Sequence, residues 1–141
     1  MGYYTNYSME VIDIDNKGYD AYKIAKYMLE KNDESEKFYT FQYGLRDFID
    51  NIDLHINYDL CLDGDDEAKW YDNEEEMLEL SQEFPDILFK LHGEGEESGD
   101  IWDKYFMNGK MQYCPAEIIC PPFDRDKLEE LEKEESELEN I

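Results

Sequence analysis

The chain has 141 residues, of which 38 are Asp or Glu and 13 are Lys or Arg, so its formal net charge at pH 7 is -25. Charge of this sign and density repels the phosphates of nucleic acids and anionic lipid surfaces, and it attracts cationic surfaces. Aromatic residues make up 15% of the sequence, which is enough apolar area to build a core, so the composition excludes a wholly disordered chain and favours one folded acidic domain.

The first predicted elements are a strand and a helix. Residues 3–14 alternate between two sets of side chains and are rich in aromatic and β-branched residues, which is the pattern of a strand. After a turn at residues 15–18, Asp20 is a good N-cap for a helix from Ala21 to about Lys31. The core-facing stripe of that helix consists of Ala21, Ile24, Ala25 and Met28.

The segment 38–62 is an insert of mixed character. Apolar residues repeat at helical spacing in its middle, which predicts a helix near residues 42–52. Residues 54–62 alternate as an amphipathic strand would, so we expect them to be extended. A turn signal follows at residues 63–66, and residues 68–71 have the composition of a short strand.

A second, better marked helix comes next. Either Asp72 or Asn73 caps it, three glutamates at residues 74–76 complement the positive end of the helix dipole, and Pro85 ends it. Residues 87–92 then alternate as a strand, and the Gly-rich segment 93–100 is predicted to be a loop.

The strongest local signal is the pair Asn108-Gly109 between two apolar runs. This pair predicts a type I′ hairpin that joins residues 101–107 to residues 110–120. Pro121-Pro122 ends the second strand. We expect the hairpin to bring a set of apolar side chains into one sheet, namely Trp102, Tyr105, Phe106, Met111, Tyr113, Ile118 and Ile119.

These elements together predict an α+β fold. We expect a mainly antiparallel sheet with two helices packed on one face, loosely ferredoxin-like, because that arrangement buries the apolar stripes most simply. Residues 1–124 would form a single domain that includes the insert 38–62. Residues 125–141 are rich in Glu and Leu, and we expect an acidic tail that is either helical or disordered.

No motif for catalysis or for binding a metal or cofactor stands out, so an enzyme is not expected. His55 and His92 are far apart in the sequence and lack the spacing of a zinc site. Residues 13–18 copy only the first half of a calcium-binding loop. In the loop 93–100, four carboxylates would repel the phosphate that a Gly-rich cradle binds. Carboxylate pairs are inevitable among 38 acids and therefore carry no information.

Cysteine usage and hydropathy favour a cytoplasmic protein. The cysteines are Cys61, Cys114 and Cys120. Their odd number and the lack of a Cys-x-x-Cys pair favour a reducing compartment. The sequence shows no secretion signal and no apolar run of about 20 residues, the length that spans a bilayer.

Several short motifs carry a resemblance to a known group of proteins. They are Gly2-Tyr3-Tyr4-Thr5, Lys69-Trp70-Tyr71-Asp72, and Gly-Glu-Gly-Glu-Glu-Ser-Gly-Asp-Ile-Trp at residues 93–102. With them the sequence resembles small acidic proteins encoded by bacteriophages and prophages, over the opening strand and about residues 69–124. That group has no established activity, so the resemblance implies a setting: phages encode acidic DNA mimics, anti-restriction and anti-CRISPR proteins that disable host DNA-binding machines.

The position of the charge indicates where a partner would bind. Residues 47–103 hold 20 of the acids and only two bases, Lys69 and Lys90. We therefore expect a non-enzymatic inhibitor or modulator that offers rows of acids, in place of nucleic-acid phosphates, to a basic nucleic-acid-binding protein. The predicted partner-binding residues are Asp63, Asp65, Asp66, Glu67, Glu94, Glu96, Glu97 and Asp100.

A second hypothesis is that the acidity serves only solubility. Recognition would then use a Tyr-rich sheet face, since tyrosine is favoured at protein interfaces. The tyrosines that exceed what a small core needs are Tyr3, Tyr4, Tyr7, Tyr39, Tyr43, Tyr58 and Tyr71. Both hypotheses expect no direct contact with nucleic acid or membrane, and both leave monomer and dimer open.

Overall fold

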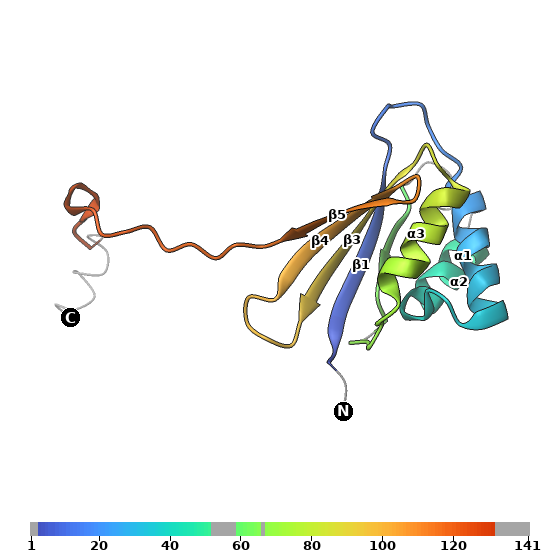
Figure 1. The fold of residues 1–141 in the computed structure, drawn as a ribbon, viewed down its shortest axis with the longest axis horizontal. Coiled ribbons are helices and arrows are strands. Elements are labelled where there is room, and N and C mark those ends of the chain that lie inside the picture. Colours follow the sequence, from blue (N-terminus) through green and yellow to red (C-terminus); the bar gives the residue numbers. More distant parts are fainter. Residues whose placement is uncertain (1–2, 52–58, 66, 132–141) are drawn as a thin grey trace.

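The computed structural model describes residues 3–51, 59–65 and 67–131. Three helices cover one face of a five-stranded sheet (Figure 1). In chain order the elements are β1 Thr5–Ile12, α1 Ala21–Ser35, the 3-10 turn η1 Tyr39–Phe41, α2 Gln42–Asp50, β2 Cys61–Asp63, α3 Asn73–Glu83, β3 Leu88–Gly95, β4 Ile101–Met107, β5 Lys110–Pro115 and the 3-10 turn η3 Arg125–Lys127. The predictions for residues 54–58, Asp66 and residues 132–141 lie outside the described residues.

The sheet has the order β2-β1-β3-β4-β5, and every neighbouring pair is antiparallel. The α+β class and the antiparallel sheet are therefore confirmed. The described chain has three helices where two were predicted to pack on the sheet, since α2 also contributes to the core. The element order differs from the β-α-β-β-α-β order of the ferredoxin-like fold, so the likeness stops at the class.

Local signals explain where several elements begin and end. The Asp20 carboxylate accepts a hydrogen bond from the Lys23 backbone N–H at 3.1 Å, which caps α1 as predicted. Helix α1 continues four residues past Lys31, to Ser35, and ends where Glu36 adopts a left-handed conformation. At the β4–β5 turn Asn108 and Gly109 have φ angles of 48° and 74°, the type I′ geometry.

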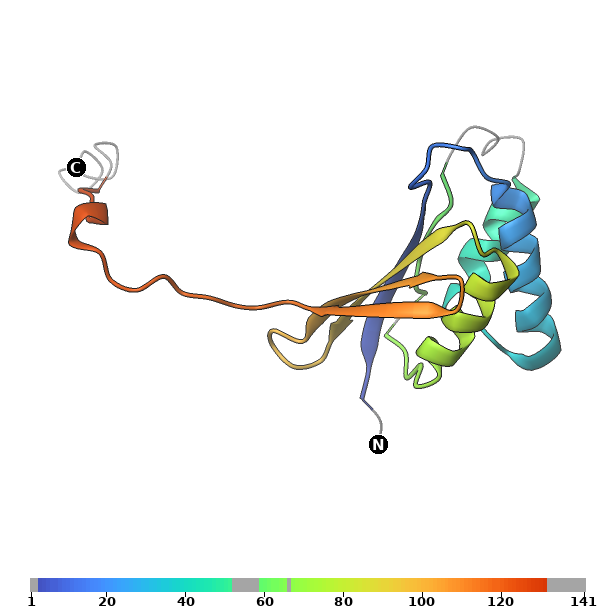
Figure 2. The ribbon, with the colours of Figure 1, turned by 45° about the horizontal axis from the view of Figure 1, so that its top comes forward.

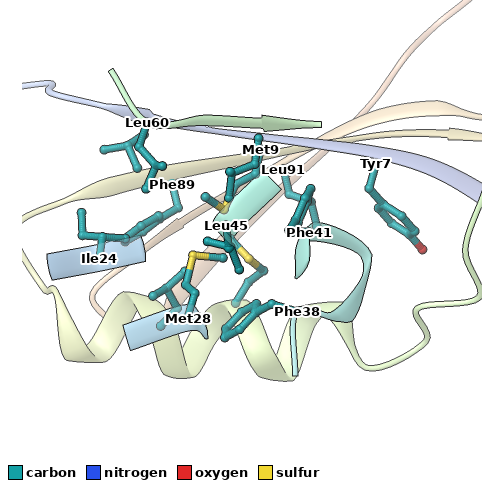
Figure 3. Close-up of a cluster of buried hydrophobic side chains, with 14 of the residues drawn as sticks. Tyr7, Met9, Ile24, Met28, Phe38, Phe41, Leu45, Leu60, Phe89 and Leu91 are labelled. Atoms are coloured by element: carbon teal, nitrogen blue, oxygen red, sulfur yellow. The ribbon is translucent and has the colours of Figure 1, made fainter. Parts of the chain in front are cut away.

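The core lies between the sheet and the helices (Figure 3). Strand β1 contributes alternate residues from Thr5 to Val11, and α1 contributes Ile24, Ala25 and Met28 of the predicted stripe. Trp70 belongs to the core and is 2% exposed. Its ring meets three aromatic rings edge to face, at centroid distances of 5.3 to 6.2 Å, and these belong to Tyr7, Phe38 and Phe41.

Three boundaries differ from the prediction. Strand β3 runs to Gly95, so the first three residues of the predicted Gly-rich loop are strand. Residues 68–71 form a single bridge, between Ala68 and Thr5, rather than a strand. Strand β5 ends at Pro115 because β4, its only partner, begins at Ile101 and offers nothing further to pair with. Ile118 and Ile119 are consequently outside the sheet, with 75% and 74% of their surface exposed.

The chain beyond β5 leads away from the sheet as an extended segment (Figure 2). We call residues 116–131 the arm. Its described part holds the short turn η3 and no α-helix, and its residues are exposed. In the described ranges, no helix combines the length and the apolar character that crossing a membrane requires.

The uneven charge predicts that salt stabilises the fold. The 20 acids of residues 47–103, balanced by only two bases, repel one another in the folded state, and salt screens this repulsion. The melting temperature should therefore rise between about 20 and about 300 mM NaCl, although the surface ion pairs weaken over the same range. Circular dichroism measures the melting temperature at each salt concentration. A value that stays flat or falls would show that attraction between paired charges outweighs the repulsion.

Candidate functional site: the acidic end of the sheet

The structure brings the two groups of predicted partner-binding acids to the same end of the sheet. Thr5, the first residue of β1, pairs with Gly95 on one side and bridges to Ala68 on the other. The segments 63–67 and 94–100 therefore flank the start of β1, and neighbouring strands are about 4.8 Å apart. We call the described acids of these segments the acidic end: Asp63, Asp65, Glu67, Glu94, Glu96, Glu97 and Asp100. Asp66 lies outside the described residues.

Tyr3 holds the β3–β4 connection against β1. Its hydroxyl donates to the Asp100 carboxylate at 2.5 Å and accepts from the Glu97 backbone N–H at 3.0 Å. The hydrogen bond to Asp100 raises the pKa of Tyr3 above its ordinary value. The Tyr4 backbone N–H donates to Glu96 at 3.0 Å. Two of the predicted acids thus have a structural task as well as a charge.

The glycines of this segment are needed for close packing and not for a phosphate cradle. A Cβ atom on Gly93 would lie 2.1 Å from the ring of Trp102, which covers it from the neighbouring strand. A Cβ atom on Gly95 would lie 2.1 Å from the Asp100 carboxylate and 2.4 Å from the Tyr3 hydroxyl. The Gly-Glu-Gly motif therefore lets two aromatic side chains lie flat on β3.

Three acids of the acidic end are the best placed to meet a partner. Asp63, Glu67 and Glu97 are exposed, and none of their carboxylates forms a hydrogen bond or ion pair with a residue in the described part of the chain. Glu94 is also exposed, but its carboxylate lies 3.2 Å from Nε2 of the His92 ring. The acidic end therefore offers carboxylates that lose no internal contact when a cation binds them.

The face of the sheet opposite the helices carries a second group of polar side chains, which we call the charged face. The strand register places them in two rows across the sheet. The first row is Asp63, Ser8, His92, Asp103 and Cys114, and the second is Cys61, Glu10, Lys90, Tyr105 and Gln112. A hollow of about 250 Å³ lies between β2, β1 and β3 on this face, with Ser8, Glu10, Cys61, Asp63, Lys90 and His92 in its lining.

Ion pairs link the centre of the charged face. The Lys90 ammonium lies 3.4 Å from Glu10 and 3.9 Å from Asp103. The His92 ring lies between two carboxylates, with Nδ1 2.7 Å from Asp103 and Nε2 3.2 Å from Glu94. Burial lowers the pKa of His92, but the hydrogen bonds to Asp103 and Glu94 outweigh it, and the net shift is upward from 6.5.

This shift predicts a pH-dependent stabilisation. Since the native state holds the His92 proton more tightly than the unfolded chain, the stabilisation is complete below pH 6.5 and is lost as the pH rises through the raised pKa. Replacing His92 by Gln should therefore lower the melting temperature more at about pH 5.5 than at about pH 8. Melting curves of the two proteins across this range test it. A difference that grows with pH would contradict the role given to His92.

Cys61, at the edge of the charged face, is not activated as a nucleophile. Burial, together with the nearby carboxylates of Glu10, Asp59 and Asp63, raises the pKa of the Cys61 thiol, which keeps the thiol protonated at neutral pH. Within the described residues, no three His, Cys, Asp or Glu side chains are arranged to hold a metal ion. The carboxylates of Glu10 and Asp103 on this face are already paired with Lys90 and His92.

Sequence reasoning missed the charged face and the role of Tyr3. The alternation along β1, β3 and β4 contained part of the signal, because Ser8 and Glu10, Lys90 and His92, and Asp103 share the phase opposite to the buried residues. The strand register cannot be read from the sequence, and it was needed to show that these side chains are neighbours across the sheet.

The structure does not gather the excess tyrosines on one sheet face. Tyr7 is buried in the core, while Tyr3 and Tyr39 are partly buried. Tyr43 and Tyr71 are exposed at 67% and 68%, but Tyr43 lies on α2 and Tyr71 lies just before α3. Tyr58 is outside the described residues.

The comparisons with known proteins add no family to this description. Comparisons with protein-family models, with curated proteins and with solved structures found no match for the chain. The function proposed below therefore rests on the geometry and charge of the chain itself.

Proposed function

We propose that this protein is a non-enzymatic inhibitor or modulator that binds a basic nucleic-acid-binding protein through the acidic end. The acids would occupy the cleft that normally receives phosphates, as in DNA mimics of the anti-restriction or anti-CRISPR kind. The observation that carries the proposal is the convergence of segments 63–67 and 94–100 on the start of β1, with Asp63, Glu67 and Glu97 exposed.

Charge density supports this reading over the solubility hypothesis. Acids that serve only solubility can be spread over the surface, whereas the chain has a near-neutral portion at residues 1–46 and a strongly anionic one at residues 47–103. Hydrogen bonds from Tyr3 and Tyr4 fix the segment 94–100 of the acidic end against the start of β1. A fixed arrangement of charge reduces the ordering cost of binding and gives specificity.

Capture of the partner from a bacterial cell lysate tests the proposal. The full chain, immobilised through its carboxyl terminus so that the start of β1 stays free, is incubated with nuclease-treated lysate at about 50 and about 300 mM NaCl, a range over which phosphate-like contacts weaken steeply. We expect retention of a basic nucleic-acid-binding protein at the lower salt and its release by added duplex DNA. The chain itself should not bind the DNA, because two bases among residues 47–103 cannot neutralise a phosphate backbone.

Two results would count against the proposal. One is saturable binding of labelled duplex DNA or RNA by the protein alone. The other is retention of a partner that neither added DNA nor salt releases, since such a partner would be held by apolar contacts rather than by the acidic end.

A further inference from the structure

The exposed apolar side chains of this protein concentrate in one part of the chain. Of thirteen large apolar residues that are exposed in the described chain, eight lie between residues 101 and 131, and most of these belong to β5 and the arm. They are Ile101, Met111, Tyr113, Ile118, Ile119, Phe123, Leu128 and Leu131. Exposed apolar side chains that follow one another along an edge strand and an extended segment indicate a contact surface.

Strand β5 and the first half of the arm are almost free of the acids that dominate the rest of the chain. Residues 104–123 contain Lys104, Lys110 and Glu117 as their only charged residues, in a chain whose net charge is -25. A second copy of this chain would be repelled by most of the surface, but not by this region. A basic partner would gain nothing here from charge attraction, so the region is best matched to another copy.

Strand β5 is also an edge of the sheet, and its register shows which backbone groups point outward. Met107 and Lys110 flank the two-residue turn, and the Ala116 N–H donates to the Ile101 carbonyl at 2.8 Å. The alternation of an antiparallel ladder then directs Lys110, Gln112 and Cys114 toward β4. Met111 and Tyr113 consequently direct their N–H and C=O groups away from the sheet, where no described strand pairs with them.

We propose that two copies of the chain pair β5 with β5 about a two-fold axis at Gln112. In this register Met111 of one copy and Tyr113 of the other exchange backbone hydrogen bonds, which gives four bonds across the axis. Their side chains, now 40% and 53% exposed, lie together on the helix side of the joined sheet. Lys110 lies opposite Cys114 of the second copy, so no like charges meet.

The arm fits the same arrangement. Antiparallel pairing places Pro115 of one copy beside Gly109 of the second copy, so the arm leaves β5 at the other copy's hairpin. A hollow of about 560 Å³ lies there, with Pro85, Leu88, Met107 and Met111 in its lining. Ile118, Ile119 and Phe123 follow Pro115 by three to eight residues, which an extended chain spans in about 10 to 27 Å. The arm of each copy therefore covers the hollow of the other.

The pairing also separates the acidic ends. Each acidic end lies where β5 finishes, beside the connection from β3 to β4 (Figure 1). Because the two β5 strands run in opposite directions, the two acidic ends lie at opposite ends of the joined sheet. Self-association thus brings together the charge-poor edges and keeps the anionic surfaces apart.

Sedimentation and cross-linking test the inference on the full chain. Sedimentation at about 150 mM NaCl, where screening is near physiological, should give twice the monomer mass. In a background with the three natural cysteines replaced by serine, Gln112→Cys should form a disulfide dimer on mild oxidation, because residues facing each other at such a pair have Cα atoms about 4.5 Å apart. Lys110→Cys is the matched control, since its two copies would be about 14 Å apart along the strands.

Two further variants separate the edge from the arm while the fold is followed by circular dichroism. Tyr113→Pro removes an outward N–H at an edge position, which a sheet tolerates, and should give a folded monomer. Ile119→Asp should raise the dimer dissociation constant at least about tenfold. A monomeric wild-type protein overturns the inference, and so does a dimer that Tyr113→Pro leaves intact. A dimer in which Lys110→Cys cross-links better than Gln112→Cys overturns the register.

Discussion

Replacing Asp63, Glu67 and Glu97 together by lysine is expected to abolish capture of the basic partner. Each desolvated contact between a carboxylate and a cation contributes about 1 to 3 kcal/mol, so three reversals lower the affinity by several powers of ten. The fold should be preserved, because these exposed carboxylates form no hydrogen bond or ion pair with the described residues. Retention on immobilised wild-type and variant protein, compared at about 50 mM NaCl, measures the effect.

A matched triple variant shows whether position or total charge matters. Glu30, Asp50 and Glu83 are also exposed and also lack a partner among the described side chains, and they lie on the helices. Lysine at these three positions changes the net charge by the same amount, and it should leave capture within about threefold of wild type. Equal loss of capture in both triples would mean that only the total charge matters, and the acidic end would not be a site.

The second large effect is expected at Trp70. Trp70→Ala should lower the free energy of unfolding by about 3 to 5 kcal/mol, because it empties a fully packed aromatic position. The ring contacts Tyr7, Phe38 and Phe41, and the Trp70 carbonyl accepts a hydrogen bond from the Asn73 side chain at 2.7 Å. The residue therefore holds the segment before α3 against the core.

Urea denaturation measures this change. Tyr43→Ala provides the comparison, since Tyr43 is 67% exposed on α2, and it should change the stability by no more than about 0.5 kcal/mol. A small effect of Trp70→Ala would show that the aromatic cluster around it is loosely packed. Its effect on partner capture should exceed that of Tyr43→Ala, because residues 63–67 lead directly into the Trp70 segment.

Elements with local signals were predicted correctly from the sequence. Asp20 caps α1, Pro85 follows the end of α3, and Asn108-Gly109 makes the β4–β5 turn. Each of these signals acts within a few residues through dihedral preference or a short hydrogen bond, so no tertiary information was required.

Elements that depend on distant partners were predicted less well. Gly93 and Gly95 have the composition of a loop, yet they lie in β3 because they pair with β1, and Gly93 also pairs with β4. Ile118 and Ile119 have the composition of a strand, yet they lie in the arm because β4 is too short to pair with them. The apolar composition of a segment does not reveal the length of the strand with which it would pair.

The candidate site shows the same division. Its acids were visible in the sequence as runs of charge, and the predicted residues Asp63, Glu67 and Glu97 are exposed as expected. Their convergence at the start of β1 came from pairings between residues up to 90 positions apart, since Thr5 pairs with Gly95. The structural task of Asp100, as an acceptor for Tyr3, had no signal in the sequence.

Displacement of DNA from the captured partner tests the central claim most directly. The partner is first saturated with a fluorescent duplex, and the protein is then titrated in while the anisotropy is followed. If the acidic end occupies the phosphate-binding cleft, the anisotropy should fall to the value of unbound duplex, and the Asp63, Glu67 and Glu97 triple variant should not lower it. A rise in anisotropy, which signals a complex of the protein, the partner and the duplex together, would contradict the account.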